Sequence, residues 1–295
     1  MLPTDHPFPP VFDRSRPLKG GFRRARREVA PDSLVAHFGR DGAVKLSGLL
    51  TGFEVDLLRA GIDENLRSPS PLAIVASGPD DPGRFVEDFC NWQRIDEYRR
   101  IMFDSKLGAA AALLTGSHTV RLYHDHMLTK EPGTRQRTPW HQDQPYYNVE
   151  GTQNVSFWIP VDPVRRHSTL EFVAGSHHGP WLMPRAFRDK QAKWFPEGTL
   201  ADLPDIEADR SRFSILGWAT EPGDVIAFNM LTLHAAGGVD SDVRRRVFSA
   251  RFVGDDMRHA PRQWLTSPPF AGLEAELEPG AALDHPLFPV VWPRR

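Results

Sequence analysis

The feature that most constrains the fold of this chain is a pair of histidine-containing segments that lie far apart in the sequence. His141 and Asp143 form an H-x-D triplet in an aromatic, turn-rich setting, and His234 follows 91 residues after Asp143. In an extended segment, residues i and i+2 point to the same side, with Cα atoms roughly 6.6 Å apart at about 3.3 Å per residue. His141 and Asp143 can therefore reach one metal ion together, and His234 must be brought to them on another strand.

Two histidines and one carboxylate form a facial triad of metal ligands. This set leaves three coordination positions open and is typical of non-haem Fe(II) oxygenases. An isolated H-x-D triplet is weak evidence because it often arises by chance, but the surroundings here favour a metal site. His234 follows a turn at Gly223 and a buried-strand pattern, and Arg245 comes eleven residues later in a strand-like run.

The hydrophobic periodicity changes along the chain from helical to strand-like. Thr51 and Glu54 form a capping box before an apolar helical stripe, and residues 85–114 are also predicted to be mostly helical, with a break near Ser105. Helices followed by many strands predict a mostly β fold, a sandwich or barrel with flanking helices. The predicted strands are 119–127, 153–161, 168–174, 224–230 and 244–253.

Composition excludes several function classes. The 295 residues carry 36 Lys and Arg against 38 Asp and Glu, a net charge of −2, so nucleic-acid or anionic-membrane binding has no electrostatic support. The single cysteine, Cys90, excludes an intrachain disulfide and fits a reducing compartment, where we expect it to be a small buried hydrophobe. With neither a signal peptide nor a long apolar run in the sequence, we expect a cytoplasmic protein.

Several segments taken together resemble a known family. They are Thr138–Gln144, Ser156–Pro160, Gly175–His177, Pro222–Asp224 and the pair His234 and Arg245. They are similar to the phytanoyl-CoA dioxygenase family of Fe(II)- and 2-oxoglutarate-dependent oxygenases, in its bacterial branch. The resemblance implies a double-stranded β-helix, the jelly roll also found in cupins, backed by N-terminal helices. We expect an N-terminal arm over 1–30 and a single oxygenase domain over 31–295, with a lid-like insertion at 179–222.

The resemblance also implies roles for individual residues. In that family the residues that match His141, Asp143 and His234 bind iron and are catalytic, and the residue that matches Arg245 grips the distal carboxylate of 2-oxoglutarate. Strand alternation places Arg245 on the same face as Ser249, towards the interior, and sends its two arginine neighbours to the surface. A guanidinium buried there needs an anion, and its fork geometry suits a carboxylate.

Further residues are candidates for the cosubstrate pocket. They are Trp158, Ser249 and Gln142. Family members often place a serine two residues after the second histidine, where this chain has Ala236, and Ser249 is the candidate replacement. His124 and His126 form a competing H-x-H pair, which with His234 could build a three-histidine cupin site.

The expected function is that of an Fe(II)- and 2-oxoglutarate-dependent dioxygenase. Such an enzyme would hydroxylate a small organic molecule and release succinate and CO₂, with ascorbate as a candidate reductant. Asp143 stands where halogenases of this class carry a small residue, which favours oxygenation over halogenation. Two alternatives stay open: a cupin-type metalloenzyme that uses no keto acid, and a non-catalytic jelly-roll binding module. The sequence is compatible with a monomer or a homodimer.

Overall fold

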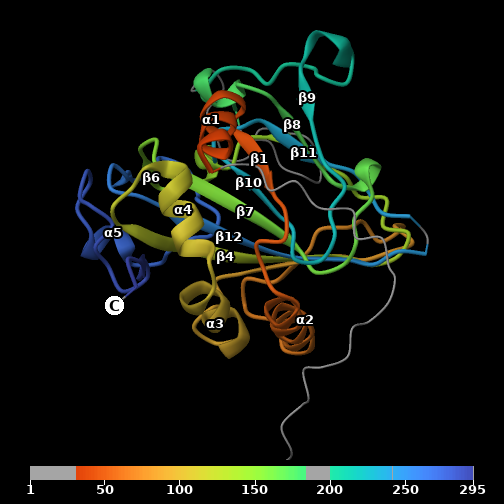
Figure 1. Ribbon diagram of the computed structural model, residues 1–295, viewed down its shortest axis with the longest axis horizontal. Coiled ribbons are helices and arrows are strands. Elements are labelled where there is room, and N and C mark those ends of the chain that lie inside the picture. The colour runs from red at the N-terminus through yellow and green to blue at the C-terminus, as the bar shows by residue number, and fades with distance from the viewer. Residues whose placement is uncertain (1–30, 184–199, 241, 295) are drawn as a thin grey trace, which may run out of the picture.

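The computed structural model describes residues 31–183, 200–240 and 242–294. Two antiparallel sheets form the body of this part of the chain, with helices around them (Figure 1). In order, the strands of the larger sheet are β1 (Ala43–Leu46), β10 (Val225–Phe228), β7 (Asn154–Pro160), β12 (Arg245–Val253), β4 (Val120–Lys130), β3 (Phe85–Phe89) and β2 (Ile74–Val75), with β14 (Val290–Trp292) also paired to β4.

The smaller sheet completes the double-stranded β-helix that the sequence predicted. In order, its strands are β5 (Thr138–His141), β11 (His234–Ala236), β8 (Leu170–Val173) and β9 (Ile215–Leu216). A separate pair joins β6 (Val149–Glu150) to β13 (Arg258–His259). The helices are α1 (Pro31–Asp41), α2 (Gly52–Arg67), α3 (Asp96–Asp104), α4 (Leu107–Thr115) and α5 (Leu273–Glu276), and the 3-10 helices are η1 (Gln144–Tyr146), η2 (Arg166–Ser168), η3 (Ser176–His178) and η4 (Arg210–Arg212).

The two faces of the larger sheet bury different side chains. On β12, Phe248, Ala250 and Phe252 point outward into the main core, where α2, α3 and α4 cover the sheet (Figure 1). Val247 belongs instead to a second core between the two sheets. This alternation is the period of two that a strand imposes, so one strand supplies both a helix-packed face and an interior face.

Helix α2 begins where the sequence predicted. The Thr51 hydroxyl accepts a hydrogen bond from the Glu54 amide at 3.3 Å, and the Glu54 carboxylate accepts one from the Thr51 amide at 2.7 Å. This capping box satisfies amides that the first helical turn leaves free. The helix then packs Val55, Leu58 and Ile62 into the core on the outer face of the sheet.

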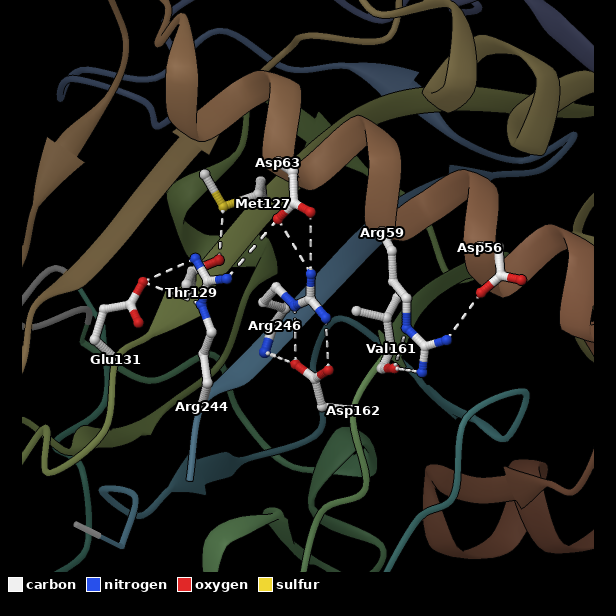
Figure 2. Close-up of polar contacts among 10 residues, drawn as sticks. All are labelled: Asp56, Arg59, Asp63, Met127, Thr129, Glu131, Val161, Asp162, Arg244 and Arg246. Atoms are coloured by element: carbon white, nitrogen blue, oxygen red, sulfur yellow. Dashed lines mark hydrogen bonds and ion pairs between the residues drawn. The ribbon is translucent and has the colours of Figure 1, made fainter. Parts of the chain in front are cut away.

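Polar contacts fasten α2 to the end of β12 (Figure 2). Arg246 pairs with Asp162 at 2.9 Å and with Asp63 of α2 at 3.1 Å. Arg244 pairs with Glu131 at 2.9 Å. Both arginines point away from the interior, as predicted, but the Arg246 side chain is only 15% exposed and is not a free surface charge.

The segment 85–114 corrects the sequence-based prediction. Phe85–Phe89 is not helical but forms β3, which pairs with β4, and the helical part is divided into α3 and α4 at Ser105. The pattern was hidden because Glu87 and Asp88 are both buried, and charged residues mask the apolar alternation of a strand. Cys90, expected to be buried, is half-buried at the end of β3.

The insertion predicted at 179–222 is only partly visible. Residues 184–199 lie outside the described residues, as does the arm at 1–30. The visible remainder contains η4 and β9. The lid therefore stays a prediction. Among the residues that the structure describes, no helix is long and apolar enough to cross a membrane.

Candidate active site

The three residues of the sequence motif come together on the smaller sheet. His141 ends β5 and His234 begins β11, and the two stand opposite each other in the register of that strand pair. The Asp143 Oδ1 atom lies 3.5 Å from His141 Nε2 and 3.7 Å from His234 Nε2. In the described part of the chain this is the one group of three or more His, Cys, Asp or Glu side chains whose ligand atoms gather closely enough for a metal, all within 4.8 Å.

Asp143 reaches the site through a turn, not along an extended strand. The strand ends at His141, and Asp143 has helical dihedral angles of φ −74° and ψ −46° as it enters η1, where a proline occupies the first turn. Its amide donates to the Met230 carbonyl at 2.8 Å. The expectation that residues 141 and 143 share one face of a strand was therefore wrong in mechanism, although the two side chains do converge.

Backbone carbonyls fix both histidine rings. Each Nδ1 lies 2.8 Å from a carbonyl oxygen, that of Pro139 for His141 and that of Thr232 for His234. A carbonyl only accepts hydrogen bonds, so each ring carries its proton on Nδ1 and presents an Nε2 lone pair towards Asp143. Burial, together with the neighbouring His141, lowers the pKa of His234 to about 3, so the His234 ring is neutral.

The Asp143 carboxylate is held ionised and oriented. Burial alone would raise its pKa, but the pKa is held well below its usual range, chiefly by the Arg251 guanidinium. The Oδ2 atom accepts from the Ser156 hydroxyl at 3.0 Å and lies 3.4 Å from the Arg251 guanidinium, which leaves Oδ1 facing the histidines. Two neutral imidazole lone pairs and one ionised carboxylate oxygen fit a divalent transition metal such as Fe(II).

Arg251 is a site residue that the sequence analysis missed. It lies on the interior face of β12, two residues beyond Ser249, and its Nε donates to the Tyr147 hydroxyl at 3.1 Å. The alternation of side chains that places Arg245 and Ser249 on the interior face of the strand also places Arg251 there. Contacts of this kind orient the side chains that bind a metal and tune the metal they hold.

At the start of the same strand face, Arg245 is buried without a carboxylate partner among the described residues. Its guanidinium donates to the Ser168 carbonyl and lies 5.8 Å from the Trp158 ring. Burial lowers the pKa of Arg245 to about 10, so the group stays charged at neutral pH. A desolvated cation without an anion is costly, and this one is free to receive a carboxylate.

One cavity joins the metal-ligating group to Arg245. Its walls include most of the predicted site residues: His141, Asp143, His234, Arg245, Trp158 and Ser249. Gln142 is an exception, because its amide group hydrogen-bonds the backbone of Pro180, Leu182 and Leu231. Its predicted role in cosubstrate binding is therefore not supported, and it instead holds the start of the 179–222 segment against the loop that precedes β11.

The competing H-x-H pair does not join the metal-ligating group. His124 and His126 lie on β4, opposite Arg251 and Ser249 of β12, and neither gathers with His234 at ligand distance in the described structure. His126 lines the cavity, whereas His124 is buried against the ring of Tyr147. The described residues therefore do not form a three-histidine cupin site.

Comparison with known proteins places this geometry in context. The family model described as "Phytanoyl-CoA dioxygenase (PhyH)" matches residues 38–247. No curated protein matches the chain in sequence. Among solved structures, the epimerase SnoN in complex with Fe3+, alpha ketoglutarate and nogalamycin RO has a TM-score of 0.71 at 22% identity, over 88% of this chain and 98% of that one.

Two more solved structures share the fold. The non-heme alpha ketoglutarate dependent carbocyclase SnoK from nogalamycin biosynthesis has a TM-score of 0.68 at 23% identity, over 92% of this chain and 99% of that one. EctD from S. alaskensis with 2-oxoglutarate and 5-hydroxyectoine has a TM-score of 0.60 at 20% identity, over 81% and 85% of the two chains.

Proposed function

We propose that this chain, which belongs to the phytanoyl-CoA dioxygenase family of Fe(II)- and 2-oxoglutarate-dependent oxygenases, hydroxylates a small organic molecule in the cavity between its two sheets. The overall reaction would be R–H + O₂ + 2-oxoglutarate → R–OH + succinate + CO₂. One oxygen atom enters the product and the other enters succinate as the keto acid loses CO₂.

The observation that carries this proposal is the preset state of the three ligand side chains. The Nδ1 hydrogen bonds of His141 and His234 leave each Nε2 atom available to bind a metal. Asp143 is ionised, and because Ser156 and Arg251 contact its Oδ2 atom, its Oδ1 atom is available as well. These residues would hold the iron, which with 2-oxoglutarate supplies the oxidising chemistry when bound. Because the ligand atoms are positioned before metal arrives, little reorganisation opposes binding.

The cosubstrate would be oriented by the other end of the cavity. Arg245 is the buried cation that lacks a carboxylate there, and Trp158 and Ser249 line the space beside it. A guanidinium matches a carboxylate through two parallel hydrogen bonds, so Arg245 would receive the distal carboxylate of 2-oxoglutarate. The unpaired cation also speaks against a cupin-type enzyme without a keto acid, and the complete ligand set speaks against a non-catalytic module.

The reaction outcome separates hydroxylation from other oxidations. Asp143 occupies the ligand position that a halide would need, which argues against halogenation. Epimerisation and carbocyclisation, named for SnoN and SnoK, leave the product without an added oxygen atom. Product mass therefore identifies hydroxylation, halogenation and oxidative ring closure, and an epimer, which has the mass of its substrate, is identified by chromatography or NMR.

The test is an aerobic screen of small molecules with Fe(II) and 2-oxoglutarate, followed by succinate analysis and product mass spectrometry. Hydroxylation requires a product heavier by one oxygen atom, with that atom derived from ¹⁸O₂. The Asp143→Ala variant serves as the control and should form no succinate above background. If every active substrate yields a halogenated, epimerised or cyclised product, the hydroxylase assignment is wrong. Absence of any iron-dependent 2-oxoglutarate turnover would remove the oxygenase assignment altogether.

A further inference from the structure

The cavity wall carries one carboxylate, that of Glu87, to which the proposed reaction gives no role. Asp143 faces the metal-ligating histidines and pairs with Arg251, and Arg245 is the cation left for the cosubstrate. Glu87, on β3, lines the same cavity with its side chain only 6% exposed. Within the described structure, its one ion-pair partner is His126, whose Nε2 lies 3.5 Å from Glu87 Oε1.

His126 is a weak partner for that carboxylate. Burial lowers the pKa of the His126 ring, more than the contact with Glu87 raises it, so the ring is mainly neutral near pH 7. The buried His126 Nε2 makes no hydrogen bond of normal geometry within the described residues. The ammonium of Lys130, on the same strand face, is instead bound to the carbonyls of Gln136 and Gly237. Glu87 therefore has no charged partner at ion-pair distance in the described structure, and Lys130 attracts its charge without forming an ion pair. A buried carboxylate in this state costs free energy.

Aromatic side chains surround Glu87 on the cavity wall. In the pairing of β3 with β4, Glu87 stands opposite Leu128 and Phe89 opposite His126, so these side chains share the interior face. The Phe89 ring stacks on the His126 ring with centroids 4.0 Å apart. Tyr146 and Phe228 complete an aromatic lining of the cavity. A carboxylate set among aromatic rings is the environment that binds an organic ammonium group.

We propose that the substrate of this enzyme carries a protonated amine, which Glu87 and His126 hold on the cavity wall. The ammonium group donates one hydrogen bond to the Glu87 carboxylate and another to His126 Nε2, which satisfies both buried groups at once. Glu87 also repels anionic substrates from this wall, so the pair selects by charge. This inference rests on the proposed function only in taking the cavity as the substrate site.

Calorimetry with simple probes tests the amine site directly. The wild-type protein, held anaerobically with Fe(II) and 2-oxoglutarate, is titrated with butylamine and benzylamine, each against its matched alcohol. At least one amine should bind about tenfold or more tightly than its alcohol, since a hydrogen bond to a charged group is worth about one decade in affinity or more. Equal affinity of each amine and its alcohol, or no binding of any probe, would overturn the proposal.

Variants connect that preference to Glu87. The isosteric Glu87→Gln should abolish the preference for the amine over its alcohol, and Glu87→Asp should retain part of it. Glu274→Gln, on exposed α5, is the matched control and should behave as wild type. An amine preference that survives in Glu87→Gln would also overturn the proposal. Thermal unfolding of each variant checks the fold, and Glu87→Asp provides the test if Glu87→Gln is unstable.

A second readout separates failure of this inference from failure of the proposed function. Succinate formation is measured with a panel of amines and their neutral analogues under air. If amines bind through Glu87 but no iron-dependent succinate forms, the oxygenase assignment falls and the amine site stands. If succinate forms equally well with neutral analogues, the oxygenase assignment stands and the amine site falls.

Discussion

The two surfaces at the start of strand β12 use the same residue type in opposite ways. On the outer surface, Arg246 is held by two carboxylates, Asp162 and Asp63, which bind the strand to α2 (Figure 2). On the inner surface, Arg245 is buried, and its guanidinium hydrogen-bonds a backbone carbonyl and no carboxylate in the described structure. Neighbouring guanidinium groups thus differ in whether the fold itself supplies the counter-ion.

This difference indicates which charges serve the fold and which serve a ligand. An ion pair completed within the protein contributes to stability and gives nothing to a ligand. A buried cation without an acidic partner opposes folding and is expected to persist where binding requires it. A related difference separates Glu87, whose ion-pair partner His126 is mainly neutral, from Asp88 beside it, whose carboxylate accepts hydrogen bonds from Ser70 and Asn65. Each of the following predictions asks whether a group acts on stability or on activity.

The largest effect should come from the metal-ligating group on the inner side. His141→Ala, Asp143→Ala and His234→Ala should each reduce Fe(II)-dependent succinate formation to background, because each removes one of the ligands that the site presents. Thermal unfolding of the metal-free variants should remain cooperative, since these side chains pack little of the main core. Full activity in any one variant would remove that residue from the ligand set.

The next largest effect should come from Arg245. A carboxylate–guanidinium pair in a desolvated pocket loses about 2–5 kcal/mol when one partner is truncated. Arg245→Ala should therefore raise the apparent 2-oxoglutarate constant by roughly 30-fold or more, since about 1.4 kcal/mol corresponds to one decade. Arg244→Ala, on the outer surface, is the matched control and should leave that constant unchanged. A large loss in the control with none in Arg245→Ala would reverse the assignment of the two surfaces.

Arg251 should show an intermediate effect on metal affinity. It contacts Asp143 Oδ2 and the Tyr147 hydroxyl, so it acts on the metal through a ligand. Arg251→Gln should weaken Fe(II) binding by about tenfold, at the lower end of what outer contacts of metal ligands contribute. Anaerobic Fe(II) titration measures this, with the 2-oxoglutarate constant at saturating iron as the comparison. If only the 2-oxoglutarate constant changes, Arg251 belongs with Arg245 as a cosubstrate residue.

The smallest effect on activity is expected at Arg246, where stability should change instead. Arg246→Ala removes the guanidinium from half-buried Asp162 and leaves it only the hydrogen bond from the backbone amide of residue 246, so the free energy of unfolding should fall by about 1–3 kcal/mol. Arg244→Ala, whose side chain is more exposed, should lower it by less than about 1 kcal/mol. Urea denaturation provides the measurement. The comparison fails if Arg246→Ala is as stable as wild type and has lost 2-oxoglutarate affinity.

The sequence was most informative where chemistry and strand periodicity coincide. His141, Asp143 and His234 were identifiable because ligand types and spacing restrict each other, and Arg245 because its alternation with Ser249 defined one face. The sequence was least informative about secondary structure where a strand carries buried charged residues. Phe85–Phe89 was assigned to a helix because Glu87 and Asp88 obscure the period of two, although their burial is what makes that strand part of the cavity.

Geometry that depends on turns was also beyond the sequence. Nothing in the H-x-D spacing showed that Asp143 would arrive through η1 and a hydrogen bond to Met230. For the same reason the sequence did not show that the Gln142 amide would hydrogen-bond the backbone of Pro180, Leu182 and Leu231, and its role at the cosubstrate stays a prediction. The capping box at Thr51 was predicted correctly because it depends only on contacts within one helical turn.

The pairing of Arg245 with Lys130 in the register of β12 and β4 has a consequence for how long the protein lasts in a cell. Both side chains are buried and neither forms an ion pair in the described structure, and the nearby Arg245 adds to burial in lowering the pKa of Lys130. A dicarboxylate bound to Arg245 would relieve that repulsion and, by mass action, stabilise the folded state in proportion to the logarithm of its concentration above the dissociation constant. Turnover of the protein would then follow metabolite supply, with the chain most vulnerable to proteases when its own cosubstrate is scarce.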